Sequence, residues 1–317
     1  MKLLWGLALC FLCLNNSDAK PQLKVSSPLT TRLLSPSVVK VNIYSDEERV
    51  SDFGSGFIVS ADGYVATAQH LFDTKKISKV EVVFRSGESV PAKLYATDEF
   101  LDLALLKVET KTKLYPCSWQ EKSQNVGASV TIYGHPFNLN FSEVHGFISA
   151  IDRSLSGSKI LDNIPNEHYQ QIRFLQIDGN LNPGLSGSPV FDQYGLVVGM
   201  SVLIPSTHGA STGIGFAVPS RFLQRSISDL IKYKKPRWNH LGIEIASSEE
   251  GLRVICSENN IFSPGDIITH FNNKKIHDLN DFMYEIKTLP VQTIIQLRIL
   301  RGKTPITLSI KLCPQTS

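Results

Sequence analysis

The six residues from Gly184 to Pro189, Gly-Leu-Ser-Gly-Ser-Pro, are the stretch of this 317-residue sequence that says most about its fold. A serine that acts as a nucleophile must project from a tight turn whose backbone N–H groups face the charge developing on the substrate. The flanking glycines allow such a turn, and the N–H groups of Gly184 and Ser186 can face the same point. The stretch alone is equally consistent with an ordinary Ser/Gly turn between two strands.

Two residues upstream supply the groups that a serine nucleophile needs, a base and a carboxylate that orients it. His70 ends the apolar run that begins at Val65, and Asp102 precedes the apolar run Leu103–Leu106. The chain order His70, Asp102, Ser186 is that of chymotrypsin-type enzymes, whereas subtilisin and the α/β-hydrolases use other orders. Taken alone, each residue is also explained as a strand-end histidine or a turn carboxylate. Their order within one β-rich region favours a catalytic triad.

Short apolar runs separated by Gly, Pro and Asn extend from Pro36 to Pro219, a pattern typical of an all-β barrel or sandwich. The polar stretch 152–170 within this region is predicted to be a long surface loop. An amphipathic helix follows, with Ser220 as its expected N-cap and Pro236 as its stop signal. We therefore place the domain boundary at 234–239.

The C-terminal part, about 238–312, is predicted to be a small α+β unit. Asp278 is a good N-cap, and an apolar face with helical spacing follows it from Leu279 to Ile286. Four strands are expected around this helix.

The composition indicates an exported protein with packed cores. Hydrophobic residues make up 42% of the chain and the net charge is +3, which gives no reason to expect nucleic acid as a partner. Lys2, an apolar run and a small-residue site at 17–19 predict a signal peptide over residues 1–19; an uncleaved anchor is the alternative. No His or Cys pair has metal-site spacing, so we expect no metal and no cofactor. Whether Cys256 and Cys313 form a disulfide stays open.

Several motifs make the chain resemble the HtrA/Deg family, in which a chymotrypsin-like double β-barrel protease domain precedes a PDZ domain. The motifs are Gly54–Tyr64, Asp102–Val108, Tyr133–Phe137, Asn182–Pro189 and Gly213–Pro219. The similarity extends over nearly the whole chain that follows the signal peptide. It implies a mainly β fold with a signal peptide (1–19), an N-terminal segment (20–35), a serine protease domain (36–233) and a small α+β PDZ domain (238–313).

The nucleophile stretch departs from the family pattern at two positions. Leu185 stands where the family has Asn, and Ser188 stands where it has Gly. Because the family's oxyanion donors are backbone N–H groups, a leucine does not remove them. The resemblance thus implies acyl transfer by His70, Asp102 and Ser186, with an oxyanion hole formed by Gly184, Ser186 and, as a further candidate, Leu185.

Substrate-binding residues are also implied by the resemblance. The base of the S1 pocket corresponds to Asn180, and Ile214 is a second candidate for its wall. Because Asn180 carries no charge, a preference for Lys or Arg lacks its counter-charge, and small or medium apolar P1 residues are the family expectation. In the PDZ domain, Leu241, Gly242 and Ile243 are candidates for binding the C-terminus of a peptide, with Phe282 on the opposite wall. Most of that helix face is alternatively explained as core.

These features predict an exported serine endopeptidase that cleaves misfolded or unfolded proteins in envelope quality control, with C-terminal peptides bound at its PDZ domain. The resemblance also implies a homotrimer and a periplasmic location, with secretion as the alternative. Two other functions stay open. One is a regulatory protease with a single dedicated partner, and the other is a peptide-binding or chaperone-like relative whose protease site is latent.

Overall fold

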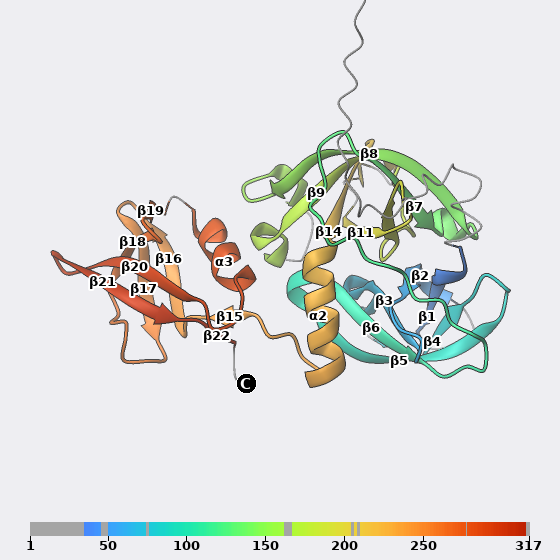
Figure 1. The fold of residues 1–317 in the computed structure, drawn as a ribbon, viewed down its shortest axis with the longest axis horizontal. Helices are drawn as coiled ribbons and strands as arrows, with labels where there is room; N and C mark the ends of the chain where they lie inside the picture. Colours follow the sequence, from blue (N-terminus) through green and yellow to red (C-terminus); the bar gives the residue numbers. More distant parts are fainter. Residues whose placement is uncertain are drawn as a thin grey trace, which may run out of the picture.

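The computed structural model describes residues 35–45, 50–73, 76–161, 167–203, 206–207, 210–276 and 278–314. The predicted signal peptide and most of the predicted N-terminal segment lie outside these residues. The described part consists of two closed β-barrels and a C-terminal sheet (Figure 1). Among its helices, none is both long enough and apolar enough to cross a membrane.

The first barrel has the strand order β1-β2-β3-β6-β5-β4, with neighbouring strands antiparallel. Its interior is filled by apolar side chains from every strand, among them Val41, Ile58 and Leu106, all fully buried. The strands are β1 (Val38–Tyr44), β2 (Val50–Ile58), β3 (Tyr64–Ala68), β4 (Lys79–Val83), β5 (Ser89–Asp98) and β6 (Leu103–Val108).

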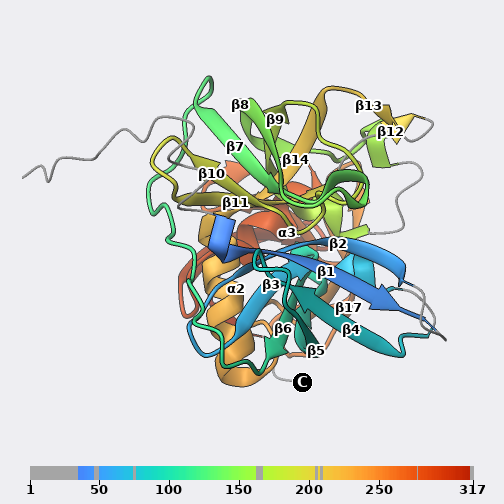
Figure 2. The ribbon, with the colours of Figure 1, turned by 90° about the vertical axis from the view of Figure 1, so that its right-hand side faces the viewer.

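The second barrel has the order β10-β11-β14-β9-β8-β7 and packs against the first, as Figure 2 shows. Ile132, Ile148 and Val190 belong to its core. Its strands are β7 (Ser129–Gly134), β8 (Ser142–Ser154), β9 (Arg173–Asp178), β10 (Pro189–Asp192), β11 (Val197–Leu203) and β14 (Ile214–Pro219), with a short hairpin of β12 (Ser206–Thr207) and β13 (Ala210–Ser211). The mainly β double barrel predicted from the sequence is thus confirmed.

The predicted polar loop 152–170 is shorter than expected. Strand β8 continues to Ser154, because its last residues pair with β9 although their side chains are exposed and polar. Two 3-10 helices follow, η5 (Lys159–Leu161) and η6 (Glu167–Gln171). The polarity of this stretch therefore indicated neither where the strand ends nor that Leu155 and Tyr169 within it are buried.

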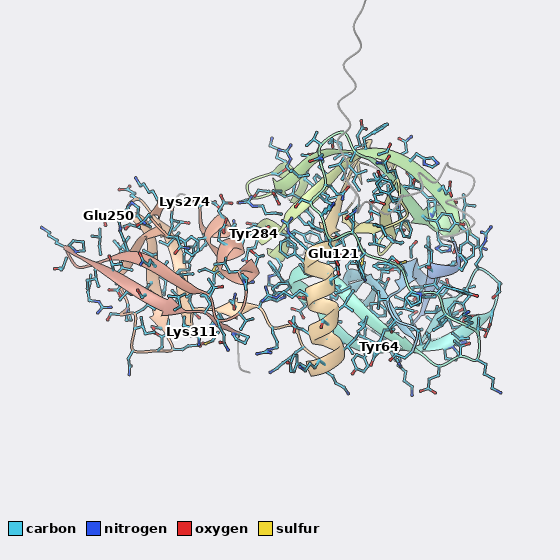
Figure 3. All side chains as sticks on the ribbon, viewed as in Figure 1. Tyr64, Glu121, Glu250, Lys274, Tyr284 and Lys311 are labelled. Carbon is cyan, nitrogen blue, oxygen red and sulfur yellow. The ribbon has the colours of Figure 1, made fainter. Side chains whose placement is uncertain are left out.

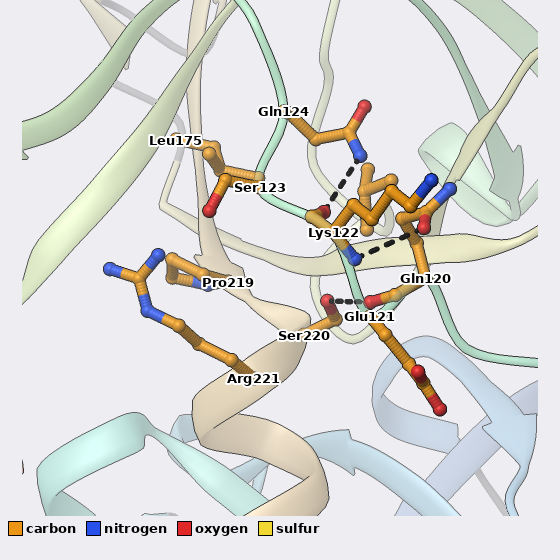
Figure 4. Close-up of a pocket in the computed structure, with 10 residues that line it drawn as sticks. Gln120, Glu121, Lys122, Ser123, Gln124, Leu175, Pro219, Ser220 and Arg221 are labelled. Atoms are coloured by element: carbon orange, nitrogen blue, oxygen red, sulfur yellow. Dashed lines mark hydrogen bonds between the residues drawn. The ribbon is translucent and has the colours of Figure 1, made fainter.

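Helix α2 (Ser220–Tyr233) follows β14 and lies on the side of the barrels that faces the C-terminal sheet (Figure 1). The predicted N-cap was wrong by one residue. Pro219 occupies that position, and the Ser220 hydroxyl instead donates to the Gln120 carbonyl over 3.1 Å (Figure 4). This contact lies beside a small cavity lined by residues 120–124, Leu175, Val198 and 219–221, none of which is a predicted site residue.

The C-terminal unit is a small α+β domain with the sheet order β16-β17-β18-β20-β21. As predicted, helix α3 (Leu279–Thr288) is capped by Asp278, whose carboxylate accepts from the Asp281 N–H at 2.9 Å. Residues 257–266, all described, contain no helix. The strands are β15 (Asn239–His240), β16 (Ile243–Ser248), β17 (Gly251–Ser257), β18 (Ile267–Phe271), β19 (Lys274–Lys275), β20 (Ile294–Arg301), β21 (Thr304–Lys311) and β22 (Cys313–Pro314).

The link between the two parts is well packed. Trp238, where the second domain was predicted to begin, is buried in the core cluster of the first part. The Arg225 guanidinium of α2 donates to the carbonyls of Thr288 and Leu289, at 3.2 and 3.1 Å. Tyr284 of α3 also points to the barrels, where its hydroxyl accepts from Arg221 (Figure 3). Helix α3 therefore docks the small domain onto α2.

The cysteines of the described part are all free. Cys256 and Cys313 are exposed and unpaired, whereas Cys117 is buried. The question of a disulfide between Cys256 and Cys313 is answered for this structure: none is formed.

Candidate active site

His70 and Asp102 are joined by several contacts at one end of the first barrel. The Asp102 carboxylate accepts from the backbone N–H of His70 and from its ring Nδ1, each at 2.7 Å. The Asp102 carbonyl also accepts from the Gln69 N–H at 3.0 Å. Asp102 is fully buried and has left-handed backbone geometry, with φ of 51°, at the end of the turn that leads into β6. These contacts fix the orientation of the imidazole, as a catalytic base requires.

The electrostatics of His70 suit this role. Burial of the ring lowers its pKa, but the hydrogen bond and charge of Asp102 act in the opposite direction, with smaller contributions from the charges of Asp73 and Asp52. The net effect raises the pKa of His70 above its ordinary value of 6.5. The Nε2 atom is then the one left for a nucleophile, because Nδ1 is engaged by Asp102.

Ser186 lies in a turn of the second barrel that is held by the first. The Ser55 N–H of β2 donates to the Ser186 carbonyl at 2.9 Å, and the Ser55 hydroxyl donates to the Gly184 carbonyl at 2.7 Å. Gly187 adopts φ of +81°, and a Cβ there would collide with the Ser55 carbonyl and lie 2.8 Å from the Ala68 nitrogen. Because Ala68 lies two residues before His70, this close approach brings the nucleophile turn next to the base.

The N–H groups of this turn divide into two kinds. That of Leu185 donates to the Asn182 carbonyl at 3.1 Å, so its prediction as an oxyanion donor is not supported. Among the described residues, none accepts from the N–H of Gly184 or from that of Ser186. These two donors are the ones available for an oxyanion. Nor does a hydrogen bond join the Ser186 hydroxyl to His70 within the described residues, and this bond is often long before substrate binds.

Each S1 candidate is next in sequence to one member of a packed pair, Leu181 and Gly215. Asn180 and Ile214 are both exposed. Leu181, next to Asn180, is fully buried, and a Cβ on Gly215 would lie 2.5 Å from its side chain. Leu181 therefore packs against the glycine that follows Ile214. The prediction that Asn180 and Ile214 contact the P1 side chain stays a prediction.

In the small domain, some of the predicted peptide-binding residues lie at an edge of the sheet, whereas Phe282 lies in the core. Leu241 and Ile243 are partly buried, and Ile243 begins β16, which is an edge strand of the sheet in the described part of the chain. The Gly242 N–H donates to His240 Nδ1 at 3.0 Å. Phe282 is only 3% exposed and packs edge-on against Phe271, which leaves almost none of its surface for a ligand.

Sequence reasoning did not identify Ser55 and Tyr169, which contact the triad or its serine turn, or Leu181, which packs beside the S1 candidates. Ser55 lies within a recognised motif, but nothing in the sequence indicated that it holds the nucleophile turn. Leu181 was passed over because it is an ordinary apolar residue. Tyr169 lies in the stretch predicted to be surface loop, yet its hydroxyl donates to Asp102 Oδ2 at 2.5 Å. Within the described ranges, no cluster of His, Cys, Asp or Glu side chains could hold a metal ion.

Comparisons with known proteins agree with this geometry. Residues 54–200 match the trypsin-like peptidase domain, and residues 240–312 match the PDZ domain. A probable periplasmic serine endoprotease, DegP-like, of Bartonella henselae is 30% identical over 279 residues, which cover 82% of this chain and 53% of that protein. The periplasmic serine endoprotease DegP of Escherichia coli K12 is 26% identical, with 84% of this chain and 58% of DegP covered. The chain thus spans about half the length of the curated relatives it matches.

Two solved structures have the same fold over nearly their whole length. The serine endoprotease from Yersinia pestis aligns with a TM-score of 0.68 and 25% identity, covering 92% of this chain and 99% of that one. The HtrA-type protease AlgW with tripeptide aligns with a TM-score of 0.72 and 24% identity, covering 92% and 98%. With a trypsin-like peptidase domain followed by one PDZ domain, the chain belongs to the HtrA/Deg family of trypsin-like serine proteases.

Proposed function

We propose that this protein is an exported serine endopeptidase whose nucleophile is Ser186. The observation that carries the proposal is the pairing of His70 with buried Asp102, beside a serine turn in which two N–H groups have no acceptor among the described residues. A binding-only relative would not need to keep a buried carboxylate on that imidazole, since an unused buried charge is costly.

The proposed reaction is acyl transfer to Ser186. The hydroxyl oxygen attacks the peptide carbonyl while His70 takes the hydroxyl proton, and His70 then gives that proton to the leaving amine. Asp102 keeps the ring oriented and stabilises the imidazolium that forms. The N–H groups of Gly184 and Ser186 stabilise the oxyanion; losing one such donor typically costs about 3 kcal/mol of barrier. Water then hydrolyses the acyl-enzyme by the same route.

The S1 pocket is proposed to accept small or medium apolar P1 residues. Asn180 offers no counter-charge for Lys or Arg at P1.

The proposed cellular role is based on the names of the relatives. Because these are called periplasmic serine endoproteases, we propose cleavage of misfolded or unfolded proteins in the envelope, with periplasmic location directed by residues 1–19. The proposed domains are the protease at 36–233 and the PDZ domain at 238–313, with C-terminal peptides added beside β16. A homotrimer is proposed from the resemblance alone.

The test is degradation of unfolded casein by the purified protein, with and without peptides that end in an apolar residue. General degradation that is lost in Ser186→Ala supports the proposal. A regulatory protease with one dedicated partner would leave casein intact while still reacting with a serine-directed probe. Casein loss that is equal in the wild type and in Ser186→Ala would overturn the proposal.

A further inference from the structure

Asp102 has a third donor that the triad alone does not require. Its Oδ2 atom accepts from His70 Nδ1 at 2.7 Å and also from the Tyr169 hydroxyl at 2.5 Å. The Oδ1 atom is bonded separately, by the His70 backbone N–H at 2.7 Å. Tyr169 therefore shares the oxygen that orients the imidazole. Hydrogen bonds from a hydroxyl to an ionised carboxylate are short and strong.

The Tyr169 hydroxyl is held in place by packing. Tyr169 is 2% exposed, and its ring packs edge to face against the ring of Phe174, with the two ring centroids 5.7 Å apart. Burial, followed by the charge and hydrogen bond of Asp102, raises the pKa of Tyr169 well above 10, so the hydroxyl keeps its proton and donates.

The turn η6, which carries Tyr169, is also fixed from its outer side. Gln171, at the end of η6, accepts from the Lys287 ammonium of α3 at 3.0 Å. Arg173, just beyond η6, forms an ion pair with Asp281 of α3. The segment that carries Tyr169 is thus held by the small domain at Gln171 and Arg173, as well as by the packing of Tyr169 against Phe174.

We propose that Tyr169 is a positioning residue of the proposed endopeptidase, whose hydroxyl holds the Asp102 carboxylate in the orientation that His70 needs. This inference rests on the proposed function. Tyr169 touches neither Ser186 nor the predicted S1 residues among its described contacts. It therefore acts through Asp102, and its removal changes the chemical step rather than substrate binding.

The direct test compares Tyr169→Phe with a matched control, Tyr95→Phe. The control also loses a partly buried tyrosine hydroxyl, but that hydroxyl donates to the Ile231 carbonyl and not to a triad residue. We expect Tyr169→Phe to lower kcat about tenfold with little change in KM, the effect of losing one hydrogen bond to a charged group. Tyr95→Phe should stay within about twofold of wild type in kcat. A purely structural role would lower the melting temperature of Tyr169→Phe and leave the kcat of the folded protein unchanged.

A second measurement does not depend on cleavage. Without the tyrosine hydroxyl, the Asp102 charge is less satisfied and interacts more strongly with the imidazolium, so the pKa of His70, followed by NMR, should rise in Tyr169→Phe and not in Tyr95→Phe. If the wild type cleaves nothing, the proposed function fails, but this titration still tests Tyr169. An unchanged His70 pKa together with unchanged kcat would overturn the inference.

A third measurement uses the wild type and so applies even if the Tyr169→Phe variant does not fold. In wild-type protein labelled at tyrosine Cζ, one signal should shift at the pKa at which His70 titrates, because both groups bond the same carboxylate oxygen. That shift should be absent in His70→Ala. If no tyrosine signal follows the His70 titration, Tyr169 does not act through Asp102.

Discussion

The backbone N–H of Ser55, in the first barrel, donates to the carbonyl of Ser186, in the second, over 2.9 Å. This bond and the close approach of Gly187 to the same strand place the nucleophile turn against the segment that carries His70. The proposed site is therefore assembled across the contact between the barrels. Its geometry depends on a few backbone contacts.

Gly187→Ala should remove activity by displacing this turn. Its Cβ would collide with the Ser55 carbonyl, and a displacement of about 1 Å at a reacting group costs roughly a hundredfold in rate. Gly157→Ala is the matched control, because Gly157 also has a positive φ, of +68°, but a Cβ there would have no atom within 4 Å among the described residues. Steady-state kinetics of the two variants measure how much activity each substitution removes. Comparable losses in both would show that the close packing at Gly187 is unimportant.

The activity should rise with pH through a step above 6.5. Asp102 and its neighbours raise the pKa of His70, so the ring stays protonated to a higher pH than a free histidine, whereas the general base must be neutral. A profile of kcat/KM against pH measures this step. Asp73→Asn should move it to lower pH, since the Asp73 charge contributes to the rise. A step well below pH 6.5 in the wild type would contradict the assignment of His70 as the base.

Asp98 should make the protein less stable as the pH rises. Burial raises its pKa to about 6, against hydrogen bonds from Ser226 and Trp238 that act in the opposite direction. A raised folded-state pKa means that the contribution of Asp98 is full below its unfolded value, near pH 4, and is lost as the pH rises through 6. The shift corresponds to a loss on the order of 3 kcal/mol.

Urea unfolding at pH 4 to 8 measures this contribution. Asp98→Asn should flatten the pH dependence of the free energy of unfolding. Trp238→Phe should destabilise more at pH 8 than at pH 5, because the carboxylate is then charged and has lost its indole donor, at 2.9 Å in the wild type. An identical pH slope in the wild type and Asp98→Asn would refute this account of Asp98.

Leu181→Ala should widen the range of accepted P1 residues. Removing its side chain opens the space beside Gly215, so the ratio of kcat/KM for leucine over alanine at P1 should rise about tenfold or more. The substitution also costs about 2–5 kcal/mol of stability. Leu175→Ala, in the same core cluster, should lose comparable stability without changing the preference. Cleavage-site profiling checks both variants, and an unchanged preference in Leu181→Ala would remove it from the pocket.

Much of the architecture could be predicted because its signals are local. Short apolar runs and the turn residues between them indicated the barrels, and Asp278 with its apolar face indicated α3. The order of His70, Asp102 and Ser186 was readable, as was the turn around the serine. The structure also confirms the contact between His70 and Asp102.

What could not be predicted depends on contacts between distant segments. Tyr169 is a tyrosine in a polar stretch, and only the fold brings its hydroxyl to Asp102. The bond from the Leu185 N–H to Asn182 is set by the shape of the turn, which the residue types leave undecided. Ser220 has the side chain of an N-cap, but the Gln120 carbonyl from the link between the barrels captures its hydroxyl.

The most direct test of the central claim is covalent labelling by an active-site phosphonate, mapped by mass spectrometry. We expect one adduct per chain, on Ser186, that is absent from Ser186→Ala and from His70→Ala. Ser188→Ala, which changes a fully buried serine two residues away, should label as the wild type does. Labelling elsewhere, or equal labelling of Ser186→Ala, would contradict the claim that Ser186 is the nucleophile.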